Sequence, residues 1–261
     1  MSFPVSPEFV VAVTLLVIVA GAVNGVAGFG FAVVGTMALA AVVDPATAVV
    51  FMIIPILAVN VSLVGDLSTT QLQTCGRRFG PLLLSALGGT IAGMVLLERI
   101  PEGPLRIGLG LVSLGFVITS QQLVRIPGLE RTKEGCFVEH PAAMAGVGGL
   151  SGLLFGGTNV GVQLVAYVRS CDLSHGLFVG VVALVFLGLN GIRVAIAAGL
   201  GLYPDTLLLG GSVAAAIPAV AGVAIGKRLR DRVGGWLRRG AVLALLTVIG
   251  VRLVLGGLGV A

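Results

Sequence analysis

Long apolar stretches dominate this chain and follow one another along most of its length. Hydrophobic residues make up 57% of the sequence and charged residues only 10%, whereas a soluble domain carries about 25% charged residues. The stretches lack the alternating pattern of about ten residues that builds an outer-membrane barrel. The chain is therefore predicted to be an all-α, polytopic helical membrane protein embedded in the lipid bilayer. The main apolar stretches are Phe9–Val23, Val49–Val64, Pro81–Leu97, Leu105–Leu123, Leu177–Asn190, Leu207–Ile225 and Ala241–Val254.

Two glycine-rich polar segments, Asn24–Gly30 and Gly148–Asn159, interrupt the apolar pattern. Each is flanked by two apolar arms that are shorter than the roughly 20 residues a helix needs to cross a bilayer. Irregular backbone at this depth is tolerated only where protein buries it or where it lines a cavity. Each segment is therefore predicted to form the tip of a re-entrant hairpin made from a broken helix. The arms are Phe9–Val23 and Phe31–Val43 for the first tip, and Ala142–Leu154 and Val160–Val168 for the second.

The order of arms and apolar stretches occurs twice, so that Ser151 stands where the first tip has Asn24. Each half holds a hairpin, which starts and ends on one side, and three spans, so the second half is predicted to be inverted. Such repeats are typical of transporters whose site lies at the repeat interface. The first repeat is predicted at 1–124 (hairpin 9–43, spans 45–64, 80–97 and 104–124), the cytoplasmic linker at 125–140, and the second repeat at 141–261 (hairpin 142–168, spans 174–198, 205–227 and 236–256).

Basic residues concentrate between the last two predicted spans. Residues 227–239 contain six Lys and Arg residues, and cytoplasmic loops of membrane proteins are enriched in these residues. This basic loop is therefore placed in the cytoplasm, in a multi-pass protein of the cell membrane. The net charge of +5 is explained by such loops, so nucleic acid is not expected as a partner. The sequence leaves open whether the protein forms a homo-oligomer.

The two tips are predicted to meet near the middle of the bilayer and to hold a small anionic solute. Inverted hairpins can aim two helix N-termini, at Gly30–Phe31 and at Thr158–Asn159, toward one centre. Each N-terminus carries unpaired N–H groups and about half a positive charge, which together attract anions. The alternative is that the glycines only allow helices to pack closely. The predicted site residues at the tips are Asn24, Gly28, Phe29, Gly30, Ser151, Gly156, Gly157, Thr158 and Asn159.

Three polar residues inside the predicted spans are further candidates for the site. Arg193 follows Asn190 in an apolar stretch, and a charged side chain within a span is costly and often functional. Arg193 either neutralises the bound anion through a bidentate contact or snorkels to the membrane interface. Asn60 and Asn190 either bind the solute or form hydrogen bonds to the backbone of a hairpin.

One short motif favours an enzyme instead of a transporter. Gly149-Leu150-Ser151-Gly152 resembles the nucleophile motif of rhomboid intramembrane proteases, for which His175 would supply the base. Helical geometry separates Ser151 from His175 by roughly 15 Å, whereas a nucleophile and its base lie about 3 Å apart. The sequence also contains no HExxH motif, Walker A loop or Cys/His metal cluster. The protein is therefore predicted not to be an enzyme and to hold no metal or other cofactor.

The tips also carry a resemblance to a known family. Gly21–Gly30 and Gly148–Gly157, together with Ile217-Pro218 and Leu237–Arg239, resemble sequences of the TauE/SafE family of sulfite and organosulfonate exporters. The resemblance extends over nearly the whole chain. It implies secondary transport of sulfite or an organosulfonate across the cytoplasmic membrane, by alternating access at the interface of two repeats. An anion channel of the same architecture is the alternative.

Overall fold

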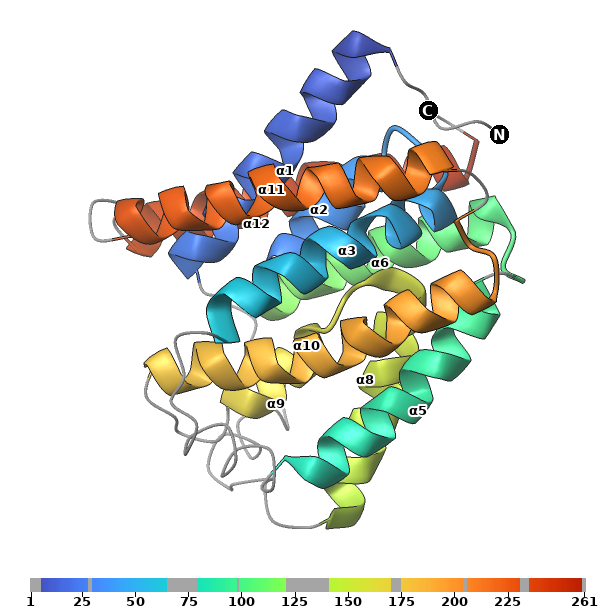
Figure 1. Cartoon of the computed structure of the whole chain (residues 1–261), viewed down its shortest axis with the longest axis vertical. Coiled ribbons are helices and arrows are strands. Elements are labelled where there is room, and N and C mark those ends of the chain that lie inside the picture. The colour runs from blue at the N-terminus through green and yellow to red at the C-terminus, as the bar shows by residue number, and fades with distance from the viewer. Residues whose placement is uncertain are drawn as a thin grey trace.

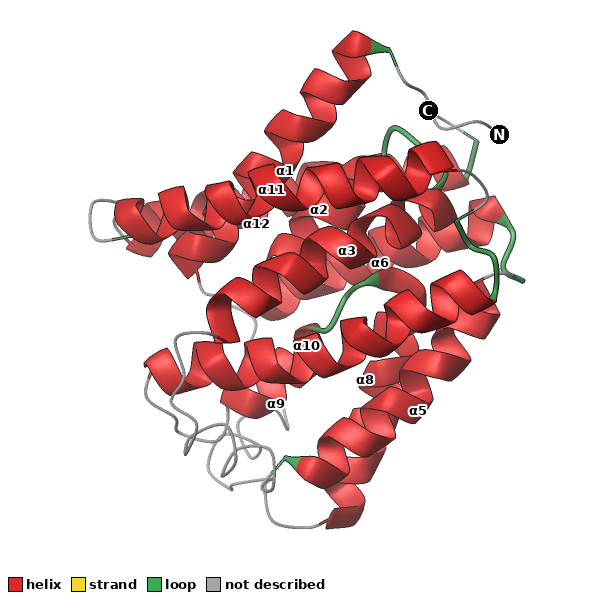
Figure 2. Ribbon diagram, in the orientation of Figure 1, coloured by secondary structure: helices red, strands yellow, loops and turns green. Residues whose placement is uncertain are grey.

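The computed structural model of the protein is a bundle of α-helices (Figures 1 and 2). It describes residues 6–27, 30–64, 79–97, 99–120, 141–169, 175–203, 206–230 and 235–259. Within these ranges every regular element is an α-helix, which confirms the all-α prediction. The described helices are α1 (Pro7–Ala27), α2 (Phe31–Ala40), α3 (Pro45–Val64), α5 (Gly80–Leu97), α6 (Glu102–Ser120), α8 (Pro141–Thr158), α9 (Val162–Arg169), α10 (His175–Gly199), α11 (Thr206–Leu229) and α12 (Gly235–Gly257).

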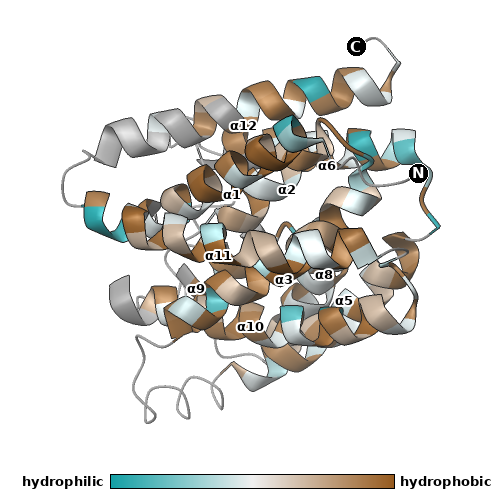
Figure 3. Ribbon diagram, turned by 45° about the horizontal axis from the view of Figure 1, so that its top comes forward, coloured by the Kyte–Doolittle hydropathy of each residue, from teal (hydrophilic) through white to brown (hydrophobic). Residues whose placement is uncertain are grey.

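The outside of the bundle is apolar, as a membrane protein requires. In the described part of the chain, α1, α3, α5, α10 and α11 are each long and apolar enough to cross a bilayer. Leu84, Leu150 and Ile217 are 71%, 70% and 77% exposed, and Figure 3 shows hydrophobic residues along nearly all the helices. A face of this kind is stable against lipid and not against water. These helices confirm a multi-pass membrane protein.

The first helix differs from its prediction. The sequence predicts a short arm at Phe9–Val23, whereas α1 spans 21 residues from Pro7 to Ala27. Its helical geometry continues through Asn24 because that residue is buried against neighbouring helices and not placed in a polar loop. At this length α1 can cross a bilayer without a second arm.

Both predicted hairpins contain a break in the helix. The first lies between α1 and α2, where Gly30 has a φ of 113°, a left-handed conformation that glycine adopts without strain. The second lies between α8 and α9, where Asn159 has a φ of 60°. Figure 2 shows the second break as a green loop that crosses the middle of the molecule.

The second break lies further along the chain than predicted. α8 continues through Gly157 and ends at Thr158, and the next helix begins at Val162. The helix N-terminus predicted at Thr158–Asn159 is therefore wrong, because most glycines of the predicted tip are helical. The reason is tertiary: these glycines are the surface through which α8 packs on α5.

The contact between α8 and α5 depends on glycine on both sides (Figure 1). Gly156 of α8 faces Gly93 of α5, and Gly89 of α5 lies against the backbone of Gly149 and Leu153 in α8. A Cβ atom on Gly152 would lie 2.1 Å from the carbonyl oxygen of Ala86, closer than any real Cβ contact. Small residues let membrane helices approach backbone to backbone and gain packing energy. The packing gained here offsets the low helix propensity of glycine.

The same arrangement joins α1 to α11. Gly21 and Gly25 of α1 face Gly222 and Gly226 of α11, and a Cβ on Gly25 would lie 2.2 Å from the carbonyl oxygen of Val223. We call the α5–α8 and α1–α11 contacts the glycine zippers. Each zipper joins a helix from the first half of the chain to a helix from the second half.

The helix contacts are consistent with a two-fold relation between the halves. Exchanging the two predicted repeats turns the α1–α11 contact into the α8–α5 contact and leaves the α3–α10 and α6–α12 contacts unchanged. The inverted orientation of the repeats and the re-entry of the hairpins stay predictions.

α3 lies at the centre and positions the site. Its start is fixed by Asp44, whose Oδ2 accepts a hydrogen bond of 2.8 Å from the backbone N–H of Thr47, as expected of an N-cap residue ahead of Pro45 at the first turn. The helix then contacts α2, α6, α10 and α11. α3 therefore touches both halves of the chain along its length.

The basic segment is mostly helical. α11 continues to Leu229 and α12 begins at Gly235, so the loop predicted at 227–239 is reduced to the few residues between them. Lys227 and Arg228 lie in the last turn of α11, where the helix dipole favours positive charge. The predicted linker at 125–140 lies outside the described residues.

Candidate functional site

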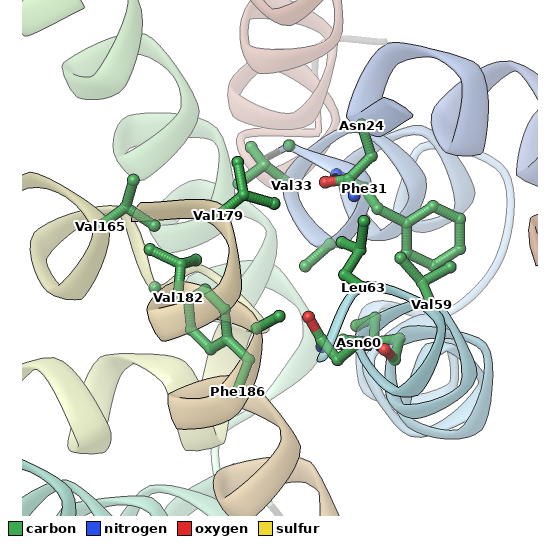
Figure 4. Close-up of a pocket in the computed structure, with 15 residues that line it drawn as sticks. Asn24, Phe31, Val33, Val59, Asn60, Leu63, Val165, Val179, Val182 and Phe186 are labelled. Atoms are coloured by element: carbon green, nitrogen blue, oxygen red, sulfur yellow. Dashed lines mark hydrogen bonds between the residues drawn. The ribbon is translucent and has the colours of Figure 1, made fainter. Parts of the chain in front are cut away.

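A cavity lies where the two breaks meet (Figure 4). Its volume is about 40 Å³, enough for about three water molecules at 10–15 Å³ each, or for a small oxyanion. Gly30 of the first break and Gly161 of the second break both line it, together with residues of α1, α2, α3, α9 and α10. Both halves of the chain therefore contribute to its wall.

The N-terminus of α2 faces this cavity. Phe31, Ala32 and Val33, the first turn of α2, line the wall, and Gly30 provides no side-chain cap for their N–H groups. The first N–H groups of a helix have no partner within the helix. α9 begins at Val162, directly after Gly161, so a second helix starts at the same cavity.

Asn24 supplies the cap that Gly30 lacks. Its Oδ1 accepts a hydrogen bond of 3.2 Å from the backbone N–H of Phe31. The side chain is 4% exposed and lines the cavity. Among the described residues, no partner is found for its Nδ2. Asn24 therefore holds an unpaired N–H donor at the wall of a mostly apolar cavity.

Asn60 and Phe186 lie across the cavity from each other, on α3 and α10 (Figure 4). Asn60 is 7% exposed, and its Nδ2 donates a hydrogen bond of 2.9 Å to the carbonyl oxygen of Ile56. That bond lies within one helix turn, so it ties Asn60 to its own helix and not to a hairpin. The Phe186 ring stacks on Phe155 at 5.0 Å between centroids.

Arg193 lies behind this aromatic pair and is completely buried. Its guanidinium lies 4.9 Å from the centre of the Phe155 ring. Nη1 donates hydrogen bonds to Asn159 Oδ1 and to Asn190 Oδ1, the second at 3.3 Å, and Nη2 donates to the carbonyl oxygen of Gly156 at 3.2 Å. The snorkelling alternative is therefore wrong, because the side chain is bound in the interior by the second break.

One N–H of this guanidinium has no partner. Nε of Arg193 is buried and makes no hydrogen bond to the described residues. None of the buried polar side chains in the described ranges is a carboxylate. Arg193 is therefore held by neutral oxygens and an aromatic face, and its positive charge is not cancelled by a described buried acid.

Asn159 joins the two halves of the chain. Its Nδ2 donates hydrogen bonds of 2.9 Å to Thr36 Oγ1 on α2 and to the carbonyl oxygen of Val49 on α3, while its Oδ1 accepts from Arg193. Asparagine is among the few residues apart from glycine that adopt a positive φ with little strain. The break in the second hairpin is thus fixed by side-chain bonds to the first hairpin.

Several other predicted residues that the structure describes do not line the cavity. Ser151 and Gly157 are buried in α8, and neither lines the wall. Thr158 Oγ1 donates to the carbonyl oxygen of Leu154 and accepts from the N–H of Val160, so it finishes α8. Asn190 contacts Arg193 and donates to the carbonyl oxygen of Phe186. Gly28 and Phe29 lie outside the described residues.

The sequence prediction missed most of the apolar wall of the cavity and several residues around it. Gly161 and Phe186 line the cavity, and Phe155 and Thr36 contact the polar groups around it. Gly161 comes shortly after the polar tip, so its position in the sequence was a signal that could have identified it as a site residue. Thr36 and the two phenylalanines look like ordinary members of apolar stretches, so no pattern distinguishes them. The described residues contain no group of three metal-ligating side chains.

Comparison with known protein families decides the family. Residues 13–253 match the family described as Sulfite exporter TauE/SafE. The chain belongs to this family. The match covers both breaks, the cavity and both glycine zippers, and it confirms the resemblance noted from the tips. No curated protein and no solved structure gives a significant match. Membership of the TauE/SafE family supports a membrane transporter of a small solute.

Proposed function

We propose that this protein is a secondary transporter that carries a small anion, such as sulfite or an organosulfonate, by alternating access. The observation that carries the proposal is the cavity at which the N-termini of α2 and α9 lie. Two helix starts and the unpaired Nδ2 of Asn24 offer N–H donors to an anion that leaves water. The family match agrees with this chemistry.

Arg193 supports the choice of an anion over a cation. Its charge lies behind Phe155 and Phe186, close to the second break, and no buried carboxylate in the described residues opposes it. A buried charge raises the local potential far more than an exposed charge does, because water screens it less. A cation at the cavity would be repelled, and an anion attracted.

The helix arrangement supports alternating access between two inverted repeats. Exchanging the two halves of the chain turns each glycine zipper into the other. The cavity lies beside α3 and α10, the central helices that correspond to each other in the two halves and that contact each other. Transporters built this way bind their solute at the interface of the repeats. The basic residues of segment 227–239 favour a cytoplasmic location for the connection between α11 and α12.

The test of this proposal is a matched pair of bulky substitutions. Val182→Phe fills the wall of the cavity, whereas Ile217→Phe adds the same ring on the lipid face, where Ile217 is 77% exposed. Purified full-length protein is screened by thermal shift against sulfite, methanesulfonate, thiosulfate, carboxylates and phosphate. A ligand at about a hundred times its Kd adds about 2.7 kcal/mol of stability.

The proposal expects wild type and Ile217→Phe to be stabilised by at least one anion and Val182→Phe not to be. It is overturned if no anion stabilises the wild type, or if Val182→Phe responds as the wild type does. Counterflow in proteoliposomes then separates the two transport mechanisms. A carrier shows saturation and exchange, whereas flux that is proportional to the gradient and shows no exchange indicates a channel.

A further inference from the structure

None of the described residues that line the cavity has an ionisable side chain. Of the fifteen described residues that line it, eleven are aliphatic or aromatic and two are glycines. The remaining two are Asn24 and Asn60, which are neutral amides. A solute in this cavity therefore meets N–H donors and carbon atoms, but no formal charge in direct contact among the described residues.

The positive potential at the cavity comes from behind its wall. The start of α2, and that of α9 next to it, each add about half a positive charge. One full charge, on Arg193, lies beyond the stacked rings of Phe155 and Phe186. Since its guanidinium donates to Asn159, Asn190 and Gly156, it is fixed in place and does not reach across the rings.

This arrangement treats singly and doubly charged anions differently. The free energy needed to remove an ion from water grows with the square of its charge, so a dianion costs about four times as much as a monoanion of the same size. Its attraction to fixed dipoles and to one distant cation only doubles. Direct contacts with several cations normally make up the difference for sulfate or phosphate, and the described residues of this wall provide no such contact.

We propose that the cavity selects monoanions, such as sulfonates, small carboxylates and hydrogensulfite, over dianions such as sulfate, hydrogenphosphate and the doubly deprotonated sulfite ion, so that sulfite is carried in its hydrogensulfite form. This inference rests on the proposed function, since it concerns the charge of the solute that the same cavity binds. The apolar wall acts in the same direction. It contacts the carbon part of an organic anion favourably and offers no hydrogen bond to a fully hydrated oxyanion.

Methanesulfonate and sulfate provide the test, because they have nearly the same size and differ by one methyl group in place of one charged oxygen. Binding of each radiolabelled anion to the full-length protein in nanodiscs is measured at equal ionic strength. We expect methanesulfonate to bind at least about tenfold more tightly than sulfate, a difference of about 1.4 kcal/mol. The same ratio is expected in proteoliposome uptake.

A matched pair of variants tests the cause. Asn60→Lys adds a cation to the wall. Asn60→Gln also lengthens the side chain at this position but leaves the wall neutral. Asn60→Lys should raise the affinity for sulfate relative to methanesulfonate, and Asn60→Gln should leave the ratio of the two affinities close to that of the wild type. If Asn60→Lys does not fold, equal or tighter binding of sulfate to the wild type still overturns the inference.

The outcomes separate the two proposals. Equal or tighter binding of sulfate in the wild type overturns charge selection but leaves an anion transporter in place. Binding of neither anion, nor of any other anion in the panel, overturns the proposed function and this inference with it. A tenfold preference for methanesulfonate that Asn60→Lys does not reduce would show that shape, and not charge, selects the solute.

Discussion

Replacing Asn159 with glycine should destabilise the protein substantially, although glycine suits the local backbone better. The φ of 60° at this position favours glycine, so the substitution removes no favourable backbone geometry. What it removes is three side-chain hydrogen bonds, to Thr36 Oγ1, to the carbonyl oxygen of Val49 and from Arg193. All three partners are buried in the core of the bundle.

The expected loss follows from these bonds. Neutral hydrogen bonds contribute about 0.5–1.5 kcal/mol each and a bond to a charged group about 1.5–3 kcal/mol, with lower values common between membrane helices. Asn159→Gly should therefore lose about 2–5 kcal/mol in the free energy of unfolding. Asn159→Ala should lose about 1–2 kcal/mol more, because alanine at a positive φ is strained.

Equilibrium unfolding of the detergent-solubilised protein in a denaturing surfactant measures both variants. Thr158→Ala is the control, since it removes a half-exposed side chain from the neighbouring position and should lose no more than about 1 kcal/mol. The reasoning is refuted if Asn159→Gly is as stable as Thr158→Ala. It is refuted in part if the alanine and glycine variants are equally stable, because the left-handed backbone then contributes nothing.

Three further predictions concern the zipper, the cavity and the buried charge. Gly156→Ala should destabilise the protein by about 1–3 kcal/mol in thermal unfolding, since its Cβ meets backbone, whereas Gly146→Ala, with nothing within 4 Å, should not; equal effects would contradict the zipper. Asn24→Asp keeps the acceptor for the N–H of Phe31 but replaces the free donor with a negative charge, so it should fold and bind methanesulfonate at least about tenfold more weakly; unchanged binding would exclude Asn24 from the site. Arg193→Gln should lower the affinity for the anion, and Arg193→Lys should have an intermediate affinity because lysine keeps the charge but lacks the planar fork. Equal affinity in the wild type and both variants would show that the buried charge does not contribute to anion binding.

The fold class could be read from the sequence because it depends on averages over long stretches. Apolar stretches of membrane-spanning length indicate helices in lipid regardless of their detailed packing. Local chemistry also fixes some boundaries: Asp44 before Pro45 predicts a helix start, and the hydrogen bond from Thr47 to Asp44 shows why α3 begins there.

The position of the second break could not be read from the sequence. Glycine breaks a helix in one setting and allows close packing in another, and only the neighbour decides which. Gly152 and Gly156 remain helical because α5 presents its backbone to them, at Ala86 and at Gly93. The actual break falls at Asn159, where side-chain bonds to α2 and α3 replace those that the helix gives up.

The role of Arg193 depended on partners distant in sequence. Its apolar surroundings left two options open, neutralising an anion or reaching the membrane interface. Gly156 and Asn159 bind it across more than thirty residues of intervening chain, and no periodicity in α10 predicts this. The cavity wall is similar, since Phe186 and Gly161 become its neighbours only when the bundle assembles.

The glycine zippers also constrain which parts of the protein can move against each other. Two helices whose backbones are in direct contact have no long side chains between them that could absorb a change in their crossing angle. Each zippered pair therefore behaves as a rigid unit. One rigid unit is α1 with α11 and the other is α5 with α8, and each contains one helix from each half of the chain. If the cavity opens to alternate sides of the membrane, the units that move against each other are therefore these two helix pairs. Neither moving unit corresponds to one half of the sequence.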